Sequence, residues 1–121
     1  MSIEEVRDFC LSLPMVTEDT AFGEDYLLFR VCDKIFACLD LTGSDYVTVK
    51  CDPDYAVELR EHYEGVVAAW HWNKKYWNQI FPNKDVSDEM LRSFIRHSFS
   101  EVVRKLPGKF RKEFPEICDI R

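Results

Sequence analysis

The sequence predicts an α+β domain built as a two-layer sandwich, an antiparallel sheet of about five strands with helices on one face. Two observations predict this fold class. Residues 26–51 hold three short apolar segments joined by tight turns, which is the pattern of antiparallel strands. Residues 3–13 and 87–106 instead carry apolar side chains at helical spacing. Helices placed at intervals among hairpin strands are typical of a sheet that they cover on one side.

The first helix is predicted to begin at Ser2, whose side chain can cap it, with Glu5 completing a capping box. Pro14 is expected to end the helix, since proline cannot donate the next backbone hydrogen bond. Its apolar face is formed by Ile3, Val6, Phe9, Cys10 and Leu13.

Three strands are predicted next. Segments 26–32 and 35–41 flank Asp33-Lys34, a connection short enough for a tight hairpin, and residues 43–45 form the following turn. Segment 46–51 alternates, so that one set of side chains (Val47, Val49 and Cys51) faces the core, and the other (Tyr46, Thr48 and Lys50) faces away. One face of the sheet is therefore expected to be buried and the other at least partly wet.

A second helix is predicted after Asp52, a suitable N-cap, and Pro53, which suits the first helical position. Gly65 is expected to supply the left-handed residue that commonly ends a helix. Segments 66–70 and 76–81 are predicted to be two further strands.

The last helix is predicted over residues 87–106, with acids in its first turn and bases in its last, as the helix dipole prefers. Pro107-Gly108 should end it, and residues 108–121 are expected to form a polar C-terminal tail laid loosely on the body. The predicted order is therefore α-β-β-β-α-β-β-α.

Length and composition indicate one domain over residues 1–121. The apolar share of 46% and the charged share of 31% are ordinary for a globular protein. The formal net charge of −6 disfavours a chain coated in positive charge, such as a histone-like packer of DNA. The total conceals an uneven distribution, because residues 1–69 carry −10 and residues 70–121 carry +4. A local basic site is therefore compatible with an acidic chain.

Five cysteines, an odd number, show neither a disulfide framework nor zinc-ligand spacing. Four lie in apolar segments, where cysteine behaves as a small hydrophobe. The N-terminal segment carries acids where a signal peptide needs bases, and no apolar run approaches the roughly 20 residues that span a bilayer. We therefore expect a cytoplasmic protein with no membrane partner. The cysteines are Cys10, Cys32, Cys38, Cys51 and Cys118.

Motifs for catalysis or cofactor binding are absent from the sequence. It contains no G-x-G-x-x-G, no phosphate-binding P-loop, no G-x-S-x-G and no H-E-x-x-H. His62, His71 and His97 have no spacing that assigns any of them a role. The acidic residues of segments 4–8 and 18–25 are interpreted as solvated surface rather than a cation site. The sequence therefore predicts a non-enzymatic protein with no catalytic residue, no metal site and no cofactor.

Basic and aromatic residues gather in the second half of the chain. Segment 104–112 holds five bases and no acid, and a lysine pair lies among the aromatic residues of segment 70–77. Lysine and arginine can neutralise phosphates, and exposed aromatic rings can stack on unpaired bases. The alternative is that the aromatic residues pack on the sheet and that the bases complement a helix C-terminus. The candidate nucleic-acid-binding residues are Lys74, Lys75, Arg104, Lys105, Lys109, Arg111, Lys112, Trp72 and Tyr76.

Several stretches together resemble the MmcQ/YjbR family of small bacterial-type domains. They occur in the order of the family and extend over nearly the whole chain. The stretches are LPMVTED (13–19), FGEDYLLFRV (22–31), VKCDPDYAVELRE (49–61), HWNKKYWN (71–78) and HSFSEVVRKLP (97–107).

The resemblance implies a two-layer α+β fold similar to those of type III secretion chaperones and frataxin. Members of this poorly characterised family are commonly labelled DNA-binding, and no catalytic motif accompanies the name. On this chain the NKK stretch of the family falls on Asn73, Lys74 and Lys75, and the end of its last helix on Arg104 and Lys105.

Three hypotheses follow. The first is a DNA-binding module that uses a local basic patch. The second, suggested by the chaperone-like fold, is a protein-interaction module that uses the sheet face or edge to bind a partner or a second copy. The third and most remote is metal handling, specifically of iron, or an enzyme.

Overall fold

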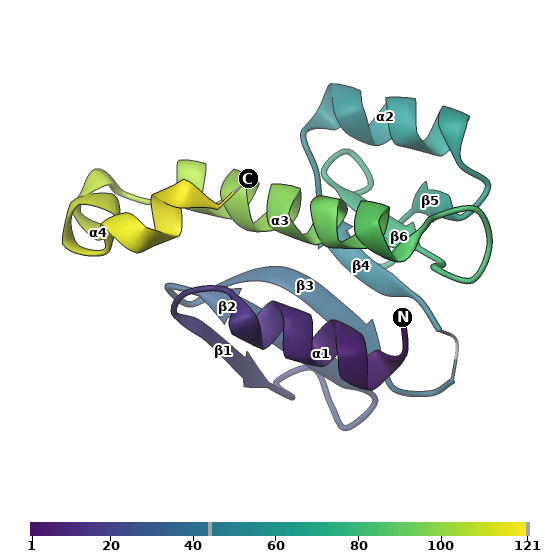
Figure 1. Ribbon diagram of the computed structural model, residues 1–121, viewed down its shortest axis with the longest axis horizontal. Coiled ribbons are helices and arrows are strands. Elements are labelled where there is room, and N and C mark those ends of the chain that lie inside the picture. The colour runs from purple at the N-terminus through teal and green to yellow at the C-terminus, as the bar shows by residue number, and fades with distance from the viewer. Residues whose placement is uncertain (44, 121) are drawn as a thin grey trace.

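The computed structural model describes residues 1–43 and 45–120. One antiparallel sheet of strand order β1-β2-β3-β4-β6-β5 is covered by helices on one face (Figure 1). The predicted α+β sandwich is confirmed. The strands are β1 (Val16–Asp19), β2 (Tyr26–Val31), β3 (Lys34–Asp40), β4 (Val47–Lys50), β5 (Val66–Ala68) and β6 (Trp77–Ile80). The helices are α1 (Ile3–Ser12), α2 (Pro53–His62), α3 (Asp88–Arg104), α4 (Gly108–Glu113) and the 3₁₀ helix η1 (Pro115–Asp119).

Strand β1 is an addition to the five predicted strands. Its sequence, VTED, has no apolar alternation, and therefore the sequence pattern did not reveal it. It forms by pairing with β2, and the Arg30 guanidinium of β2 donates to the Asp19 carboxylate at 2.6 Å. A strand whose stability comes from its partner leaves little local signal.

The predicted helix N-termini are confirmed. Ser2 and Glu5 form the reciprocal capping box of α1. The Asp52 carboxylate accepts from two backbone N–H groups at the start of α2, and Ser87 caps α3 by accepting from the Met90 N–H. Each cap satisfies donors that have no partner within the helix.

One predicted turn is shifted by a residue, and a second can be compared with the structure only in part. The β2–β3 hairpin turns at Cys32-Asp33, one residue earlier than expected, and both residues have positive φ (47° and 66°). Two successive positive φ angles characterise the type I′ turn, whose twist matches a two-residue hairpin. The turn predicted at 43–45 includes Ser44, which lies outside the described residues.

The role predicted for Gly65 is wrong. Helix α2 ends at His62, and its C-cap is Tyr63 in an extended conformation. Gly65 is needed for space, because a Cβ there would lie 2.8 Å from the Phe81 carbonyl oxygen and 3.0 Å from Asp85 Oδ1. The Asp85 carboxylate accepts from the backbone N–H groups of Glu64 and Gly65, which draws the two segments together.

The C-terminal segment is not a loose tail. Residues 108–113 form α4 and residues 115–119 form η1, and Ile117 is fully buried in the core. The Arg111 guanidinium donates to the carbonyls of Val103, Arg104 and Leu106, and so satisfies acceptors exposed at the end of α3. Tertiary contacts of this kind cannot be read from the polar composition of the segment.

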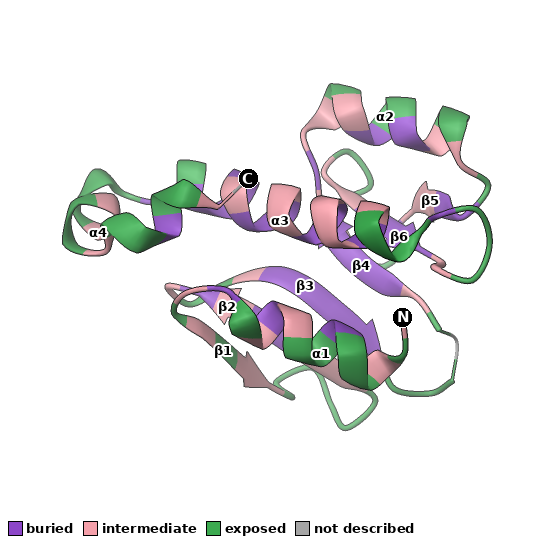
Figure 2. Ribbon diagram, viewed as in Figure 1, coloured by how far each residue is buried: buried purple, intermediate pink, exposed green. Residues whose placement is uncertain are grey.

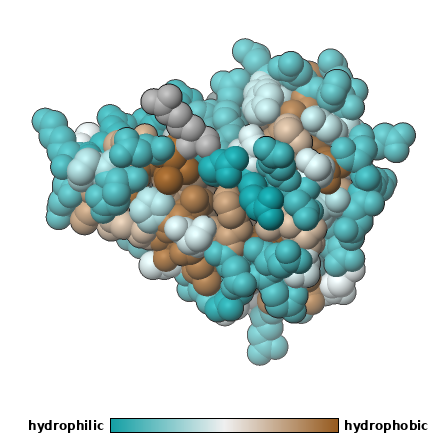
Figure 3. Space-filling model, in the orientation of Figure 1, coloured by the Kyte–Doolittle hydropathy of each residue, from teal (hydrophilic) through white to brown (hydrophobic). Residues whose placement is uncertain are grey.

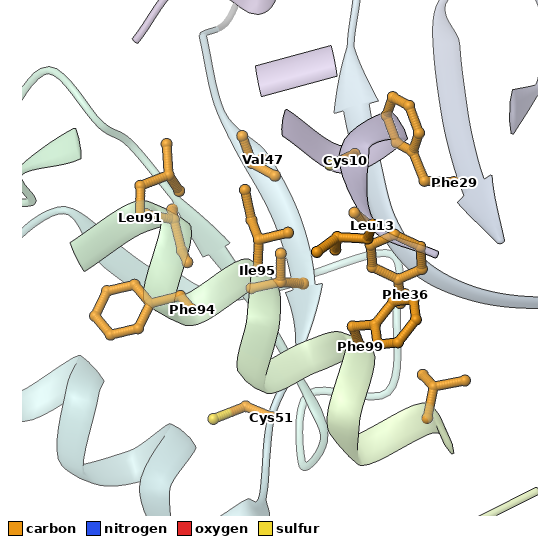
Figure 4. Close-up of a cluster of buried hydrophobic side chains, with 14 of the residues drawn as sticks. Cys10, Leu13, Phe29, Phe36, Val47, Cys51, Leu91, Phe94, Ile95 and Phe99 are labelled. Atoms are coloured by element: carbon orange, nitrogen blue, oxygen red, sulfur yellow. The ribbon is translucent and has the colours of Figure 1, made fainter. Parts of the chain in front are cut away.

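The core lies between the sheet and its helices. Phe36 and Phe99 meet edge to face, with ring centroids 5.2 Å apart. Leu13 and Ile95 lie beside this pair, and Phe29 lies next to Cys10 (Figure 4). A register shift opposite Phe29 and Arg30 lets the adjacent residues Phe36 and Ala37 both join the core. Strands β3 and β4 are buried along most of their length (Figure 2).

The helical face is mostly hydrophilic at its surface. Hydrophobic atoms show where α1 approaches α3, and hydrophilic side chains surround them (Figure 3). No described helix has both the length and the apolar character needed to cross a bilayer.

Candidate nucleic-acid interface

The sheet face opposite the helices is buried at its centre. Cys38 of β3, Thr48 of β4 and Gln79 of β6 are cross-strand neighbours in one row. Their exposed fractions are only 4%, 1% and 8%, respectively. The face predicted to be at least partly wet is therefore dry at this row, because chain segments outside the sheet cover it, and half-buried at Tyr46 and Lys50 on either side.

Aromatic residues from two connections provide this cover. Phe22 comes from the β1–β2 connection and Trp72 from the β5–β6 connection, and their ring centroids lie 5.8 Å apart. Trp72 also lies 4.4 Å from the ring of Trp77 on β6. Asn73 shapes the second connection, since its carbonyl accepts from the N–H groups of Tyr76 and Trp77 and its side chain accepts from the Lys75 N–H.

Three lysines converge on Tyr76. The Nζ atoms of Lys105, Lys75 and Lys50 lie 4.6, 5.5 and 5.9 Å from the centroid of its ring. They come from the C-cap of α3, the β5–β6 connection and the end of β4. The Cys51 N–H donates to the Tyr76 carbonyl at 2.7 Å, which fixes the end of β4 beside this ring.

A hollow of about 550 Å³, here called the basic groove, adjoins this cluster. Asp33 is the acidic residue on its lining, and Arg30 is paired with Asp19. The basic groove therefore offers lysine ammoniums beside two indole rings. The lining residues used below are Arg30, Lys34, Lys50, Lys105, Trp72 and Trp77.

Lys50 is partly buried and has other cations near it. Burial first, and then the cations Lys105, Arg104 and Lys34, lower the pKa of Lys50 from its ordinary value, against the opposing charge of Glu101. Crowded ammonium groups destabilise one another, and an anion placed among them would relieve that repulsion. The groove is therefore suited to hold a phosphate or another compact anion.

The sequence-predicted residues divide into two groups. Trp72, Tyr76, Lys75 and Lys105 lie at or beside the basic groove. The others do not line it. Lys74 lies over the ring of Trp70 at 3.9 Å, and Arg104 donates two hydrogen bonds to the Glu101 carboxylate.

The remaining predicted bases belong to the C-terminal helix α4. Arg111 is committed to carbonyls of α3, Lys109 lies 5.2 Å from the ring centroid of Phe110, and Lys112 is exposed. Arg111 therefore has the role given by the alternative interpretation, in which bases complement a helix C-terminus.

Arg30, Lys34, Lys50 and Trp77 were not among the predicted site residues. Lys50 had a visible signal, because strict alternation in 46–51 places it on the face away from the core. Arg30, Lys34 and Trp77 show no sequence signal that distinguishes them from ordinary strand residues. Their convergence depends on which strands are neighbours, and this is a property of the whole sheet.

Several acidic side chains and one histidine of the described residues have structural partners. Arg7 and Arg30 hold the pKa values of Glu18 and Asp19 below the ordinary range through direct hydrogen bonds. His97 Nε2 accepts from the Asp52 N–H at 3.2 Å. Within residues 1–43 and 45–120, no group of three or more His, Cys, Asp or Glu side chains is arranged to hold a metal ion.

The cysteines are all free thiols. Burial raises the pKa of Cys10, Cys38 and Cys51 to about 12, with smaller contributions from nearby acids at the latter two, so that these thiols stay protonated and unreactive. Cys118 is exposed, and Cys32 lies half-buried in the β2–β3 turn.

Comparison with known proteins identifies the family. The family model described as YjbR matches residues 11–101, well over half of the chain. The chain belongs to the YjbR family. This assignment includes all six strands, α2 and most of α3.

Relatives of this YjbR-family chain include two uncharacterized proteins. YbdF of Escherichia coli O157:H7 is 29% identical over 110 residues, which are 90% of this chain and 90% of YbdF. YjbR of Escherichia coli strain K12 is 24% identical over 113 residues, which are 93% of this chain and 96% of YjbR.

Two solved structures share the fold. A Deinococcus radiodurans protein with a DUF419 domain superposes with a TM-score of 0.87 at 28% identity, covering 94% of this chain and 88% of its own. A Pseudomonas syringae protein superposes with a TM-score of 0.69 at 22% identity, covering 81% and 96%.

Proposed function

We propose that this YjbR-family protein is a non-enzymatic module that binds single-stranded DNA through the basic groove. The convergence of Lys50, Lys75 and Lys105 on Tyr76 is the observation that carries the proposal. Lysines that neutralise phosphates and aromatic rings that stack on bases are the two components of single-strand binding sites. The indole rings of Trp72 and Trp77 line the same groove.

A single strand fits this proposal better than a duplex does. A groove of about 550 Å³ accommodates a short stretch of unpaired chain, whereas a double helix presents its phosphates over a much wider surface. The net charge of −6 also disfavours broad contact with a polyanion. A cytoplasmic location belongs to the proposal, since buried free thiols persist in a reducing compartment.

A protein-interaction module has less support. The exposed large apolar side chains come from five separate segments of the chain. They are Met15, Phe22, Leu41, Val57 and Trp70. The ring of Phe22 contacts Trp72, which lines the basic groove, rather than the exposed ring of Trp70.

The test is a titration with a single-stranded oligonucleotide of about ten nucleotides at several salt concentrations between about 50 and 200 mM. Three lysine–phosphate contacts predict a slope near −2 for log K against log salt, at about −0.7 per phosphate. The double variant Lys50→Gln, Lys105→Gln should weaken binding by about tenfold or more and make the slope shallower by about 1.4.

The control is Lys109→Gln, Lys112→Gln, which removes the same charge from α4, outside the groove. It should change affinity by less than about twofold. Absence of binding near 50 mM salt would refute the proposal. Equal losses in the two double variants would also refute it, because they would show a response to net charge alone.

A further inference from the structure

We propose that a cavity on the sheet face beside the basic groove binds one unpaired nucleobase, whose phosphate then lies in the groove; the choice of a nucleotide ligand rests on the proposed function. This sheet-face cavity has a volume of about 260 Å³. Its floor is the buried row of Cys38, Thr48 and Gln79. Its covering residues include Phe22 and Trp72.

The floor is neutral and offers hydrogen bonds. Among the described residues, the hydroxyl of Thr48 and the amide of Gln79 have no hydrogen-bond partner, although both residues are more than nine-tenths buried. No described side-chain polar atom is both fully enclosed and unpaired, and hence these groups remain open to the cavity. A hydroxyl and an amide present both donors and acceptors, as the edge of a base requires.

Charged ligands are disfavoured in the cavity itself. Burial, together with the charge of Asp40, raises the pKa of the Cys38 thiol to about 12, and burial with a hydrogen bond to Asp40 raises that of Tyr46 to about 12. Both groups are therefore uncharged at neutral pH. A neutral polar ligand can exchange water for these partners, whereas a phosphate would lose its hydration at a floor that carries no cation. His71 is the basic side chain on the lining, and it comes from the covering β5–β6 connection.

The walls are aromatic. Tyr26 of β2 and Tyr46, which directly precedes β4, line the cavity on the sheet side. Phe22, His71 and Trp72 line it from the two covering connections. Flat π-faces around a small hydrogen-bonding floor favour a planar heteroaromatic ring. The volume lies just below the range of about 300–1,000 Å³ that drug-sized ligands occupy, which suits one base and excludes a base pair.

The cavity and the groove are adjacent. Trp72 lines both of them. Thr48 on the cavity floor and Lys50 in the groove are two residues apart on the same face of β4, a distance of roughly 7 Å along a strand. The same spacing relates Gln79 to Trp77 on β6. The sheet thus presents a neutral site for a planar ring one row from a cationic site. A nucleotide matches both, because it carries a neutral planar base and an anionic phosphate.

The experiment measures affinity for three probes. They are a single-stranded oligonucleotide, an abasic oligonucleotide with the same number of phosphates, and the four deoxynucleoside monophosphates. The variant is Thr48→Val, Gln79→Leu, which keeps side-chain size and removes the polar floor. The control is Thr17→Val, the same threonine replacement on edge strand β1, outside the cavity lining.

We expect the normal oligonucleotide to bind about tenfold or more tightly than the abasic one. The floor variant should reduce that ratio by about three- to tenfold, with the abasic affinity unchanged, and Thr17→Val should alter neither. If the variant is misfolded by circular dichroism, the abasic comparison on the unmodified protein still decides the question.

The outcomes separate the two proposals. Equal affinity for normal and abasic strands, with dependence on Lys50 and Lys105 retained, overturns the base cavity and leaves strand binding intact. If the monophosphates bind, the floor variant abolishes that binding, and the oligonucleotide binds no more tightly than they do, the cavity is supported. The same result would show that the natural ligand is a free nucleotide and not a DNA strand. Absence of binding by all three probes overturns both.

Discussion

The two faces of the sheet are both buried at their centres, but by different means. On one face, helices pack on Val47 and Val49, each 2% exposed, and form a continuous apolar core. On the other, Thr48 between them is 1% exposed, yet it lies under aromatic side chains from two connections and beside a cavity. Helices that interdigitate with a sheet leave little empty space, whereas connections that cross it leave polar groups accessible to a ligand.

The largest expected effect is on the helical face. Phe99→Ala should lower the free energy of unfolding by about 3–5 kcal/mol, because Phe99 is fully buried against Phe36. The matched replacement Phe22→Ala, on a ring that is 55% exposed, should cost less than about 1 kcal/mol. Urea unfolding measures both, and similar costs would contradict the distinction between the faces.

The cover over the second face should have an intermediate effect. Trp72→Ala should cost about 1–2 kcal/mol, less than a fully buried ring, and should open the cavity floor, so that the Cys38 thiol reacts with a thiol reagent. Thiol titration under native conditions measures this change. Trp70→Ala, in the same connection but 70% exposed, should leave both stability and thiol reactivity unaltered.

A pH effect is expected on the helical side. Burial lowers the pKa of His97 from its ordinary 6.5, more strongly than Glu101 and Asp52 raise it. Below about pH 6.5 the unfolded chain therefore binds more protons than the folded one, and the free energy of unfolding should fall as the pH decreases through this window. The stability that depends on neutral His97 should be fully present above about pH 6.5.

The matched variant for this effect is His97→Gln, whose amide oxygen can still accept from the Asp52 N–H. Unfolding measured between about pH 5 and pH 8 should show a smaller decline in the variant. An unchanged decline would assign the pH dependence to other groups.

The smallest expected effect is on the cavity floor. Thr48→Val should change the free energy of unfolding by less than about 0.5 kcal/mol, because its hydroxyl has no partner among the described residues. A loss above about 1 kcal/mol would mean that the hydroxyl is needed within the fold, and would weaken its assignment to a ligand.

Much of the fold could be predicted from the sequence because its signals are local. The caps Ser2, Asp52 and Ser87 act on backbone groups within three residues, and alternation in 46–51 assigns each side chain to a face. Strand β1 and helix α4 were missed because their stability derives from pairing with β2 and from docking against α3.

The α+β class, the main helices and strands, the family resemblance and a basic second half all follow from the order of residues along the chain. The bases that share a site become evident once the chain is folded. Lys50 and Lys105 meet because β4 pairs with β6 and because α3 ends over that part of the sheet. Strand register and helix packing are long-range properties, and no spacing within the chain specifies the point at which distant side chains converge.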